Sequence, residues 1–294
     1  MYIDGVFSGG GIKGFALIGA YEAIEARGLQ FKRLAGTSAG SIVAGLIAAG
    51  YTSQEVYQLL DELDVKKLLD ERKSWLPGPL AKWLHLYWKL GLYKGKYLEI
   101  WLEEKLRIKG IRTFKDLPPQ TLRIIASDLS NGKMLVLPDD LEKYGIPWWS
   151  FSVAKAIRMS CSLPFFFEPI KLYTGDGTNI IVDGGVLSNF PMWLFDKENV
   201  KKVRPVLGIK LSESFQDHER HQINNGIQMF EAIFETMKDA HDARYISRKH
   251  EKNIIFIPTK GVLTTEFNLS EKDKLALIQL GKDRAAEFLK RWAY

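Results

Sequence analysis

Hydrophobic residues at the start of the chain alternate between short continuous runs and helically spaced positions. The apolar run over residues 2–8 predicts a buried strand, and residues 31–35 predict a second one. Between them, apolar side chains recur every three or four positions over residues 15–27, which predicts a helix that ends at Gly28. Small apolar residues predict a further helix over residues 38–49. This order is typical of βαβ units and a mainly parallel sheet.

The rest of the chain contains further strand and helix patterns. Strands are predicted at residues 122–127, 134–137, 180–182, 204–211 and 253–257. Two long helices that pack on the core are predicted near the end. The first has an apolar stripe formed by Ile223, Ile227, Phe230, Phe234 and Met237. The second starts at Ser270, a residue type that favours the N-cap position.

These patterns together predict an α/β fold of three layers, α/β/α, with a mostly parallel central sheet. We expect one domain over residues 1–294, in which residues 212–294 add helices and a strand. Residues 75–97 leave this pattern and are predicted to form a cap or lid. The sequence carries no signal for an oligomeric state.

Charge and cysteine content exclude some classes of partner. The formal net charge is +6, but basic and acidic residues are interleaved, so no basic patch for nucleic acid is predicted. The lone Cys161 cannot form an intrachain disulfide and is expected to be a buried structural residue. The first residues resemble no secretory signal, and we expect a cytoplasmic protein that is at most peripheral at a membrane surface.

A glycine-rich loop follows the first predicted strand, with the sequence Gly9, Gly10, Gly11, Ile12, Lys13, Gly14. Glycines let backbone N–H groups face a ligand, and the next helix adds its positive N-terminal dipole, so the loop suits a phosphate or an oxyanion. The spacing also matches the dinucleotide pattern G-x-G-x-x-G. That interpretation requires an acidic residue at the end of the second strand, and none lies there.

Two further motifs carry a nucleophile and a carboxylate. Residues 36–40 read G-x-S-x-G between a predicted strand and helix, which is the context of a nucleophile elbow around Ser38. An ordinary serine N-cap explains the same residues equally well. Asp183 ends an apolar run and precedes two glycines, which also fits a common Asp-Gly turn. Together with the glycine loop, the motifs supply a nucleophile, a base and an anion site.

In this order, the three motifs resemble the patatin-like phospholipase family, whose pattern is G-G-G-x-[KR]-G, then G-x-S-x-G, then D-G-[GA]. Residues 125–132, 160–169 and 183–191 look similar to other stretches of the family, so the resemblance covers about residues 2–211. It implies a Ser–Asp dyad without histidine, in lipid acyl hydrolases of the phospholipase A or lysophospholipase type.

Transferred by motif, the resemblance implies a role for each matching residue. Ser38 attacks the ester and forms an acyl-enzyme, and Asp183 acts as its base. The oxyanion hole is formed by the N–H groups around Gly9, Gly10, Gly11 and Ile12. The motifs are completed by supporting residues: Lys13, Gly14, Gly36, Gly40, Gly184 and Gly185. The expected substrate is a lipid or phospholipid, and this chemistry needs no metal or organic cofactor.

Several predictions refine or oppose this assignment. A carboxylate is a weak base, so we expect burial to raise the pKa of Asp183 above about 3.9. Lys13 is expected to pair with a carboxylate. The five histidines, His85, His218, His221, His241 and His250, are not expected to act as the base or as metal ligands. The alternative function is a non-catalytic lipid-binding or regulatory protein on the same fold.

Residues 75–93 combine aromatic and basic positions. Leu80, Leu84 and Trp88 share one helical stripe, and Trp83, Tyr87 and Leu90 share its neighbour. The basic residues Lys82, His85 and Lys89 lie on the opposite face, a pattern typical of helices that lie in a membrane interface. A cap that covers an acyl channel explains the same pattern, and both roles remain open here.

Overall fold

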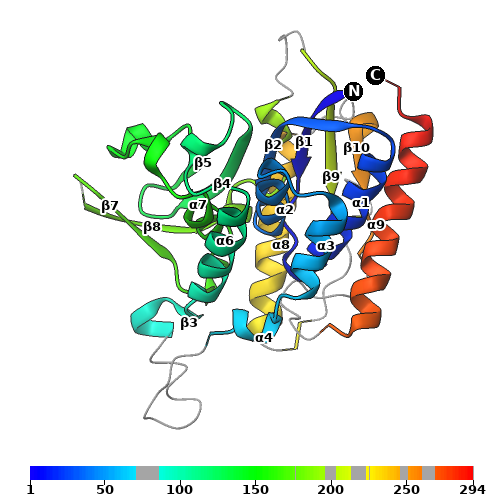
Figure 1. The fold of residues 1–294 in the computed structure, drawn as a ribbon. Coiled ribbons are helices and arrows are strands. Elements are labelled where there is room, and N and C mark those ends of the chain that lie inside the picture. The colour runs from blue at the N-terminus through cyan, green and yellow to red at the C-terminus, as the bar shows by residue number, and fades with distance from the viewer. Residues whose placement is uncertain are drawn as a thin grey trace.

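The computed structural model describes residues 1–70, 86–175, 177–195, 203–212, 223–224, 226–245, 251–259 and 269–293. Figure 1 shows a central sheet flanked by helices on both sides, which confirms the predicted α/β fold with a mostly parallel sheet. Of the helices within these described ranges, none has the length and apolar character to cross a bilayer.

The sheet is built around parallel strands from both ends of the chain. Five strands run parallel as neighbours: β10 (Ile254–Phe256), β9 (Val206–Lys210), β1 (Tyr2–Phe7), β2 (Gln30–Thr37) and β4 (Leu122–Asp128). Three strands extend it in antiparallel pairings: β5 (Lys133–Leu137), β8 (Gly177–Asp183) and β7 (Ile170–Thr174). All strands predicted from the sequence are present, and β7 was not predicted.

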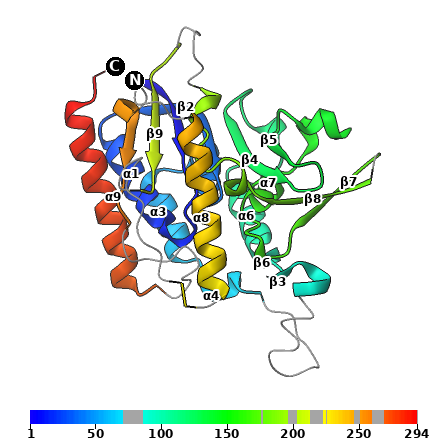
Figure 2. The ribbon, with the colours of Figure 1, turned by 180° about the vertical axis from the view of Figure 1, so that it is seen from behind.

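Helices cover both faces of the sheet. One face carries η1 (Gly11–Gly14), α1 (Phe15–Ala26), α2 (Ala39–Ala48), α3 (Ser53–Asp61) and α4 (Val65–Leu68). Helix α8 (Gly226–Tyr245) lies on the opposite face, as Figure 2 shows. Helix α9 (Glu271–Arg291) runs along α1, where Gly19 and Gly281 each lie against the backbone of the partner helix. The predicted N-cap is confirmed, because Ser270 accepts the Asp273 N–H.

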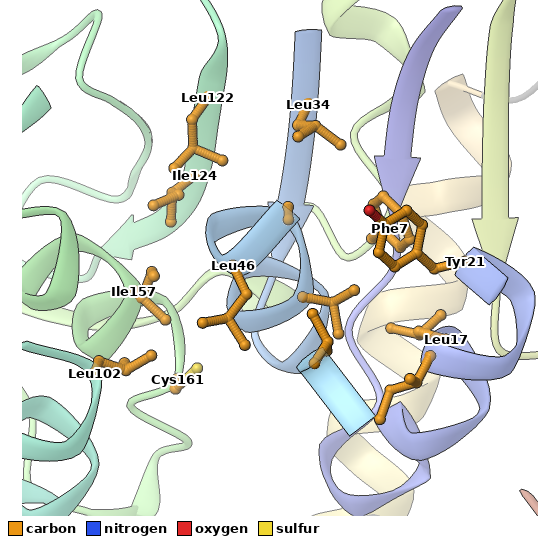
Figure 3. Close-up of a cluster of buried hydrophobic side chains, with 14 of the residues drawn as sticks. Phe7, Leu17, Tyr21, Leu34, Leu46, Leu102, Leu122, Ile124, Ile157 and Cys161 are labelled. Carbon is orange, nitrogen blue, oxygen red and sulfur yellow. The ribbon is translucent and has the colours of Figure 1, made fainter. Parts of the chain in front are cut away.

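Apolar side chains from the sheet and from the overlying helices share one core. Figure 3 shows Phe7, Leu17, Leu34 and Leu46 within it, and all four are at most 1% exposed. Each large aliphatic side chain buried in this way stabilises the fold by about 1.5–3 kcal/mol. This core holds the ends of β1 and β2 in fixed positions beneath the glycine loop and the predicted elbow.

The sequence patterns did not predict two helices that contribute to this core or a small sheet that lies beside it. They are α6 (Lys96–Ile108), α7 (Val153–Ser160), and the pair β3 (Gly91–Tyr93) and β6 (Phe165–Phe167). The Asp70 carboxylate accepts the backbone N–H groups at the start of α6, including those of Lys96 at 2.8 Å and Tyr97 at 3.1 Å. Residue 70 therefore lies next to residues 95–97, so the two ends of the intervening stretch of chain are close together. Of the stretch predicted as a cap or lid, residues 75–85 lie outside the described residues.

The apolar stripe predicted to pack α8 on the core is only partly correct. Ile223 precedes the helix and is 53% exposed, and Met237 is 41% exposed. Phe234 is buried, and so is Lys238, a charged residue on the same helical face. The prediction failed because it counted only apolar residues, while the buried face of α8 also includes a lysine.

Candidate active site

Ser38 directly follows β2 and occupies the N-cap position of α2. Its φ of 51° and ψ of −127° are costly for a residue with a side chain, on the order of 1–3 kcal/mol. Its hydroxyl makes no capping hydrogen bond. The ordinary N-cap interpretation is therefore wrong, and the strained turn presents the side chain to a different partner.

The glycines around Ser38 are required by close backbone contacts. A methyl group at Gly40 would lie 2.5 Å from the carbonyl oxygen of Ser8, and one at Gly36 would lie 2.7 Å from the Ser41 nitrogen. Neither backbone atom can rotate away as a flexible side chain could. The absence of side chains at these positions lets α2 start immediately above β1 and β2.

Asp183 is the hydrogen-bond partner of Ser38. The Ser38 hydroxyl donates to Asp183 Oδ2 at 2.7 Å, and the Gly185 N–H donates to Oδ1 at 2.7 Å. The Asp183 N–H in turn donates to the Ser162 carbonyl at 2.9 Å. Gly184 lies against the backbone of Ile125, where a side chain would not fit. Both carboxylate oxygens and the backbone of Asp183 are thus fixed.

The sheet topology explains why these two residues meet. Strand β5 pairs with residues 124–128 of β4, so β2 and β8 share the other edge of β4. Thr37 of β2 pairs with Ile125, and Asp183 of β8 pairs with Ala126, the next residue. Because β2 runs parallel to β4 and β8 runs antiparallel, their C-terminal ends point at each other. A serine directly after β2 therefore faces the last residue of β8.

Burial makes Asp183 a stronger base than an ordinary aspartate. The side chain is 1% exposed, and loss of solvation raises its pKa from 3.8 to about 6. Hydrogen bonds from Ser38 and Gly185 oppose this rise, and so do the positive charges of Lys238 and Arg158. The predicted direction of the pKa shift is confirmed.

The glycine loop lies next to Ser38, but its residues are not equivalent. The Gly9 N–H donates to the Asn189 carbonyl at 3.1 Å, so Gly9 is not available as an oxyanion donor, contrary to the expectation from the motif. The N–H groups of Gly10, Gly11 and Ile12 donate to no acceptor within the described residues. These three groups are the donors that the loop can offer to a ligand.

Ser160, at the end of α7, supports the elbow from behind. Its hydroxyl donates to the Ile125 carbonyl at 2.6 Å and accepts the Ser38 N–H at 2.8 Å. The Ser38 N–H is therefore engaged by Ser160 and is not available to a ligand. No role for Ser160 was predicted, because its partners lie far away along the chain and no local pattern marks such a contact.

Arg158 fixes the same segment to the small β3–β6 sheet. Its guanidinium donates to the carbonyls of Lys94 at 2.7 Å, Gly95 at 2.7 Å and Glu168 at 2.9 Å. A further N–H donates to the Ser162 hydroxyl at 2.5 Å. This buried cation is satisfied by neutral acceptors, and burial lowers its pKa. It stabilises the backbone that accepts the Asp183 N–H.

A pocket opens beside the Ser38–Asp183 pair. Apolar side chains from α2, α3, α4 and α6 line one side, and residues of β6 and α8 line another. The apolar lining comprises Ile12, Phe15, Ile42, Val43, Leu60, Leu63, Leu68, Leu98, Leu163, Phe167 and Phe234. Polar groups are few and lie near the pair, where Asn189 and Lys238 join them. This distribution suits a long apolar ligand with one polar end.

The remaining candidate residues lie apart from this chemistry. Lys13 pairs with Glu235 of α8 at 3.7 Å, which confirms the predicted carboxylate partner. His241 lies on α8 and does not line the pocket, while the other four histidines fall outside the described residues. Over the described ranges, no group of His, Cys, Asp and Glu gathers as a set of metal ligands.

Cys161 is buried, as expected, in the cluster that Figure 3 shows beside Leu102 and Ile157. Its Sγ lies 3.8 Å from the Ser41 hydroxyl. Burial raises the pKa of the thiol to about 12, so the thiolate is not formed at neutral pH. The serine therefore remains the only nucleophile among the described side chains at the pair.

Comparison with known proteins places this arrangement among lipid hydrolases. The family model described as patatin-like phospholipase matches residues 5–196. An uncharacterized protein of Bacillus subtilis, YqhO, is 57% identical over 294 residues and is covered completely, as is this chain. A probable lipid hydrolase of Invertebrate iridescent virus 6 is 25% identical over 224 residues, which cover 74% of this chain and 72% of that protein.

The fold also matches a solved structure. VipD from Legionella pneumophila superposes with a TM-score of 0.58 over 99% of this chain and 67% of the VipD chain. The sequences are 17% identical, so this likeness supports the fold alone.

Proposed function

Because this chain belongs to the patatin-like phospholipase family, a family of lipid hydrolases, we propose that it hydrolyses carboxylic esters of lipids through a dyad of Ser38 and Asp183. The observation that carries the proposal is the 2.7 Å hydrogen bond from the Ser38 hydroxyl to a buried carboxylate. A serine needs a base to become a nucleophile, and within the described residues Asp183 is the group in position.

The reaction begins when Ser38 Oγ attacks the ester carbonyl while its proton passes to Asp183. Asp183 then returns the proton to the leaving alcohol, and an acyl-enzyme on Ser38 remains. Water, deprotonated by the same carboxylate, attacks the acyl-enzyme. The bond between the acyl carbon and Ser38 Oγ then breaks, Asp183 returns the proton to Oγ, and the fatty acid leaves. Because its pKa is raised, Asp183 takes a proton from a hydroxyl group more readily than an ordinary carboxylate does.

The negative charge on the carbonyl oxygen requires donors that are already in place. The N–H groups of Gly10, Gly11 and Ile12 have no other acceptor among the described residues and lie at the pocket beside Ser38. Donors of this kind contribute about 3–4 kcal/mol each to transition-state stabilisation in serine hydrolases. Gly9 supports the loop through its bond to Asn189 instead.

The pocket supports an acyl chain as the substrate's longest part. Leu60, Leu63, Leu68 and Leu98 are among its lining residues, and an alkyl chain gains about 0.8 kcal/mol for each methylene that it buries against such side chains. Phospholipase A or lysophospholipase activity fits this pocket.

We further propose that the chain contacts a membrane interface through residues 75–93, of which residues 86–93 are described. Among the described residues of this stretch, Tyr87 and Trp88 are 75% and 72% exposed, and amphipathic aromatic rings favour the headgroup region. Trp88→Ser should weaken sedimentation with anionic phospholipid vesicles by several-fold. Trp149→Ser, at another exposed tryptophan, is the matched control and should not. Equal loss in both variants would contradict this contact.

A short-chain p-nitrophenyl ester tests the dyad directly. Wild-type protein should hydrolyse it and should take up a fluorophosphonate label on Ser38, which mass spectrometry locates. Ser38→Ala and Asp183→Asn should each lose at least about a thousandfold in kcat. Folded wild-type protein that binds lipid vesicles but neither hydrolyses esters nor takes up the label would favour the alternative, a non-catalytic lipid-binding protein.

A further inference from the structure

Lys238 is a buried cation in the wall of the candidate active site. It lies on α8, one helical turn after Phe234, and both side chains line the pocket that contains Ser38 and Asp183. The residue is 9% exposed, and its ammonium lies 5.7 Å from the centre of the Phe234 ring. A lysine here is unexpected from hydrophobic patterning, because lysine is rarely buried unless it is paired.

The other buried lysines of the described residues have anionic partners. Lys210 pairs with Asp242 at 2.6 Å, and Lys274 pairs with Glu271 at 2.5 Å. Arg158, also buried, donates to four acceptors. The Lys238 ammonium alone among these cations has neither a hydrogen bond nor an ion pair to any described residue.

The Lys238 ammonium nitrogen is not among the fully enclosed side-chain atoms that lack a partner, so it keeps accessible surface in the pocket wall. The face of one aromatic ring compensates its charge only in part. The carboxylate of Asp183 lies in the same pocket, but it is engaged by Ser38 and Gly185. Lys238 therefore retains three N–H donors for an anion that enters the pocket.

The position of Lys238 in the pocket indicates which part of a substrate carries the anion that it binds. Helices α3 and α6, which contribute Leu60 and Leu98 to the lining, lie on one face of the sheet, and α8 lies on the opposite face, as Figures 1 and 2 show. The ester is held between them, at Ser38. An acyl chain that enters among the leucines leaves the alcohol portion of the ester on the side of α8. In a glycerophospholipid, that portion carries a phosphate.

We propose that Lys238 binds the phosphate of a glycerophospholipid or lysophospholipid substrate and makes the site prefer such lipids to neutral acylglycerols. This inference rests on the proposed ester hydrolysis at Ser38. Lys13, the other cation close to the glycine loop, does not replace Lys238 because Glu235 already pairs with it. Lys238 acts as a specificity residue and takes no part in the covalent steps.

A purely electrostatic role for Lys238 gives a different result. If the ammonium only stabilised the Asp183 anion, its removal would change the hydrolysis of every ester by the same factor. The ratio of kcat/KM between two substrates that differ only in the phosphate separates these roles. A lysophosphatidylglycerol and the monoacylglycerol with the same acyl chain form such a pair, each used below its critical micelle concentration.

The test compares this ratio in wild type, Lys238→Met, Lys238→Arg and Lys282→Met. Lys238→Met should lower the preference for the phosphate-bearing lipid about tenfold or more, because a charged hydrogen bond is lost. Lys238→Arg should retain most of it. Lys282→Met removes the same charge from an exposed ion pair with Glu22 and should leave the ratio unchanged. An equal loss on both lipids in Lys238→Met, or no preference in wild type, would overturn the proposal.

Measurements of lipid binding test the phosphate site independently of the proposed ester hydrolysis. In a Ser38→Ala background, which cannot form an acyl-enzyme, calorimetry should detect tighter binding of lysophosphatidylglycerol than of the monoacylglycerol, and Lys238→Met should abolish the difference. A binding preference for the phosphate-bearing lipid, without ester hydrolysis by wild type, would contradict the proposed reaction and still support the phosphate site. Inorganic phosphate and a free fatty acid, added as competitors, show whether the site recognises phosphate or any anion. Competition by the fatty acid alone would contradict phosphate recognition.

Discussion

The two segments that hold Ser38 in place differ in the forces that constrain them. On one side lies the elbow segment, residues 36–41, which ends β2 and begins α2. On the other lies the 158–163 segment, which ends α7. Both reach Ser38 within a hydrogen bond, since Ser41 donates to the Ser38 carbonyl at 2.6 Å and Ser160 accepts the Ser38 N–H at 2.8 Å.

The elbow segment is constrained by space. Its glycines touch backbone atoms of neighbouring strands and turns, and its serine adopts a strained conformation that the fold imposes. The 158–163 segment is constrained by hydrogen bonds instead. Ser160 and Arg158 connect it to Ile125, to β3 and to β6 through side-chain donors and acceptors. The elbow segment has no room for added atoms, whereas the 158–163 segment depends on the hydrogen bonds of its polar side chains.

This difference predicts how each segment responds to a methyl group. Gly40→Ala places a carbon atom against the carbonyl oxygens of Phe7 and Ser8, and the backbone must shift to admit it. We expect a loss of about 3 kcal/mol in the free energy of unfolding, measured by urea denaturation, because overpacking at rigid atoms has this cost. Activity on a p-nitrophenyl ester should fall with it, because Ser38 moves with the elbow.

Gly226→Ala is the matched control, since a methyl group there meets no atom within 4 Å. It lies at the start of α8 and should leave stability unchanged or raise it slightly. If Gly40→Ala were as stable and as active as Gly226→Ala, the elbow segment would not be constrained by space, and the contrast between the two segments would fail.

The same difference explains what could be predicted from the sequence. The glycine loop, the elbow and Asp183 are detectable because close backbone contacts leave a local mark, glycine at fixed spacing. The strands and helices around them were predicted within a few residues, because each has a clear apolar period. Ser38 and Asp183 were therefore identified before their contact was known.

Features that depend on distant partners were not predictable in this way. Ser160 and Arg158 bind residues that lie tens of positions away, so no spacing in their own segment reveals them. The availability of the Gly9 N–H depended on Asn189, which belongs to another turn. Lys238 interrupts an apolar stripe, and only the fold reveals that it lines the same pocket as Ser38 and Asp183.

Asp183 contacts both segments, through the Ser38 hydroxyl and the Ser162 carbonyl, and its ionisation makes the stability of the protein depend on pH. Its folded-state pKa is raised, so the carboxyl group contributes stability that is fully present below about pH 4 and is lost as the pH rises through about 6. At about pH 8 the buried charge destabilises the protein by on the order of 3 kcal/mol. Asp183→Asn removes this charge. Its amide oxygen can accept the Gly185 N–H, and its NH2 can donate to the Ser38 hydroxyl, which reverses that bond.

We therefore expect Asp183→Asn to be inactive and yet more stable than wild type at about pH 8, with a difference that disappears near pH 4. Thermal unfolding across this pH range measures it. The activity of wild type should fall on the acid side with a midpoint near 6, because the base must be ionised. A variant less stable than wild type at the higher pH would mean that Asp183 is held as a structural ion.

Ser160→Ala tests the hydrogen-bonded side with the smallest change. The substitution leaves the Ser38 N–H and the Ile125 carbonyl without their partner, and it adds no atoms. We expect a loss of about 1 kcal/mol in stability and about tenfold in kcat, with KM nearly unchanged, because the elbow is displaced while the pocket is not. Ser160→Thr retains the hydroxyl and should recover most of the kcat.

The matched control for Ser160 is Ser150→Ala, where the hydroxyl donates to the Pro147 carbonyl at the surface. That bond exchanges readily with water, so its loss should change neither kcat nor stability beyond about 0.5 kcal/mol. Equal behaviour of the two alanine variants would show that the Ser160 hydroxyl is dispensable. Ser38 would then be positioned by the elbow segment alone, through its strained turn and its glycine contacts, and the 158–163 segment would serve only to hold Asp183 through the Ser162 carbonyl.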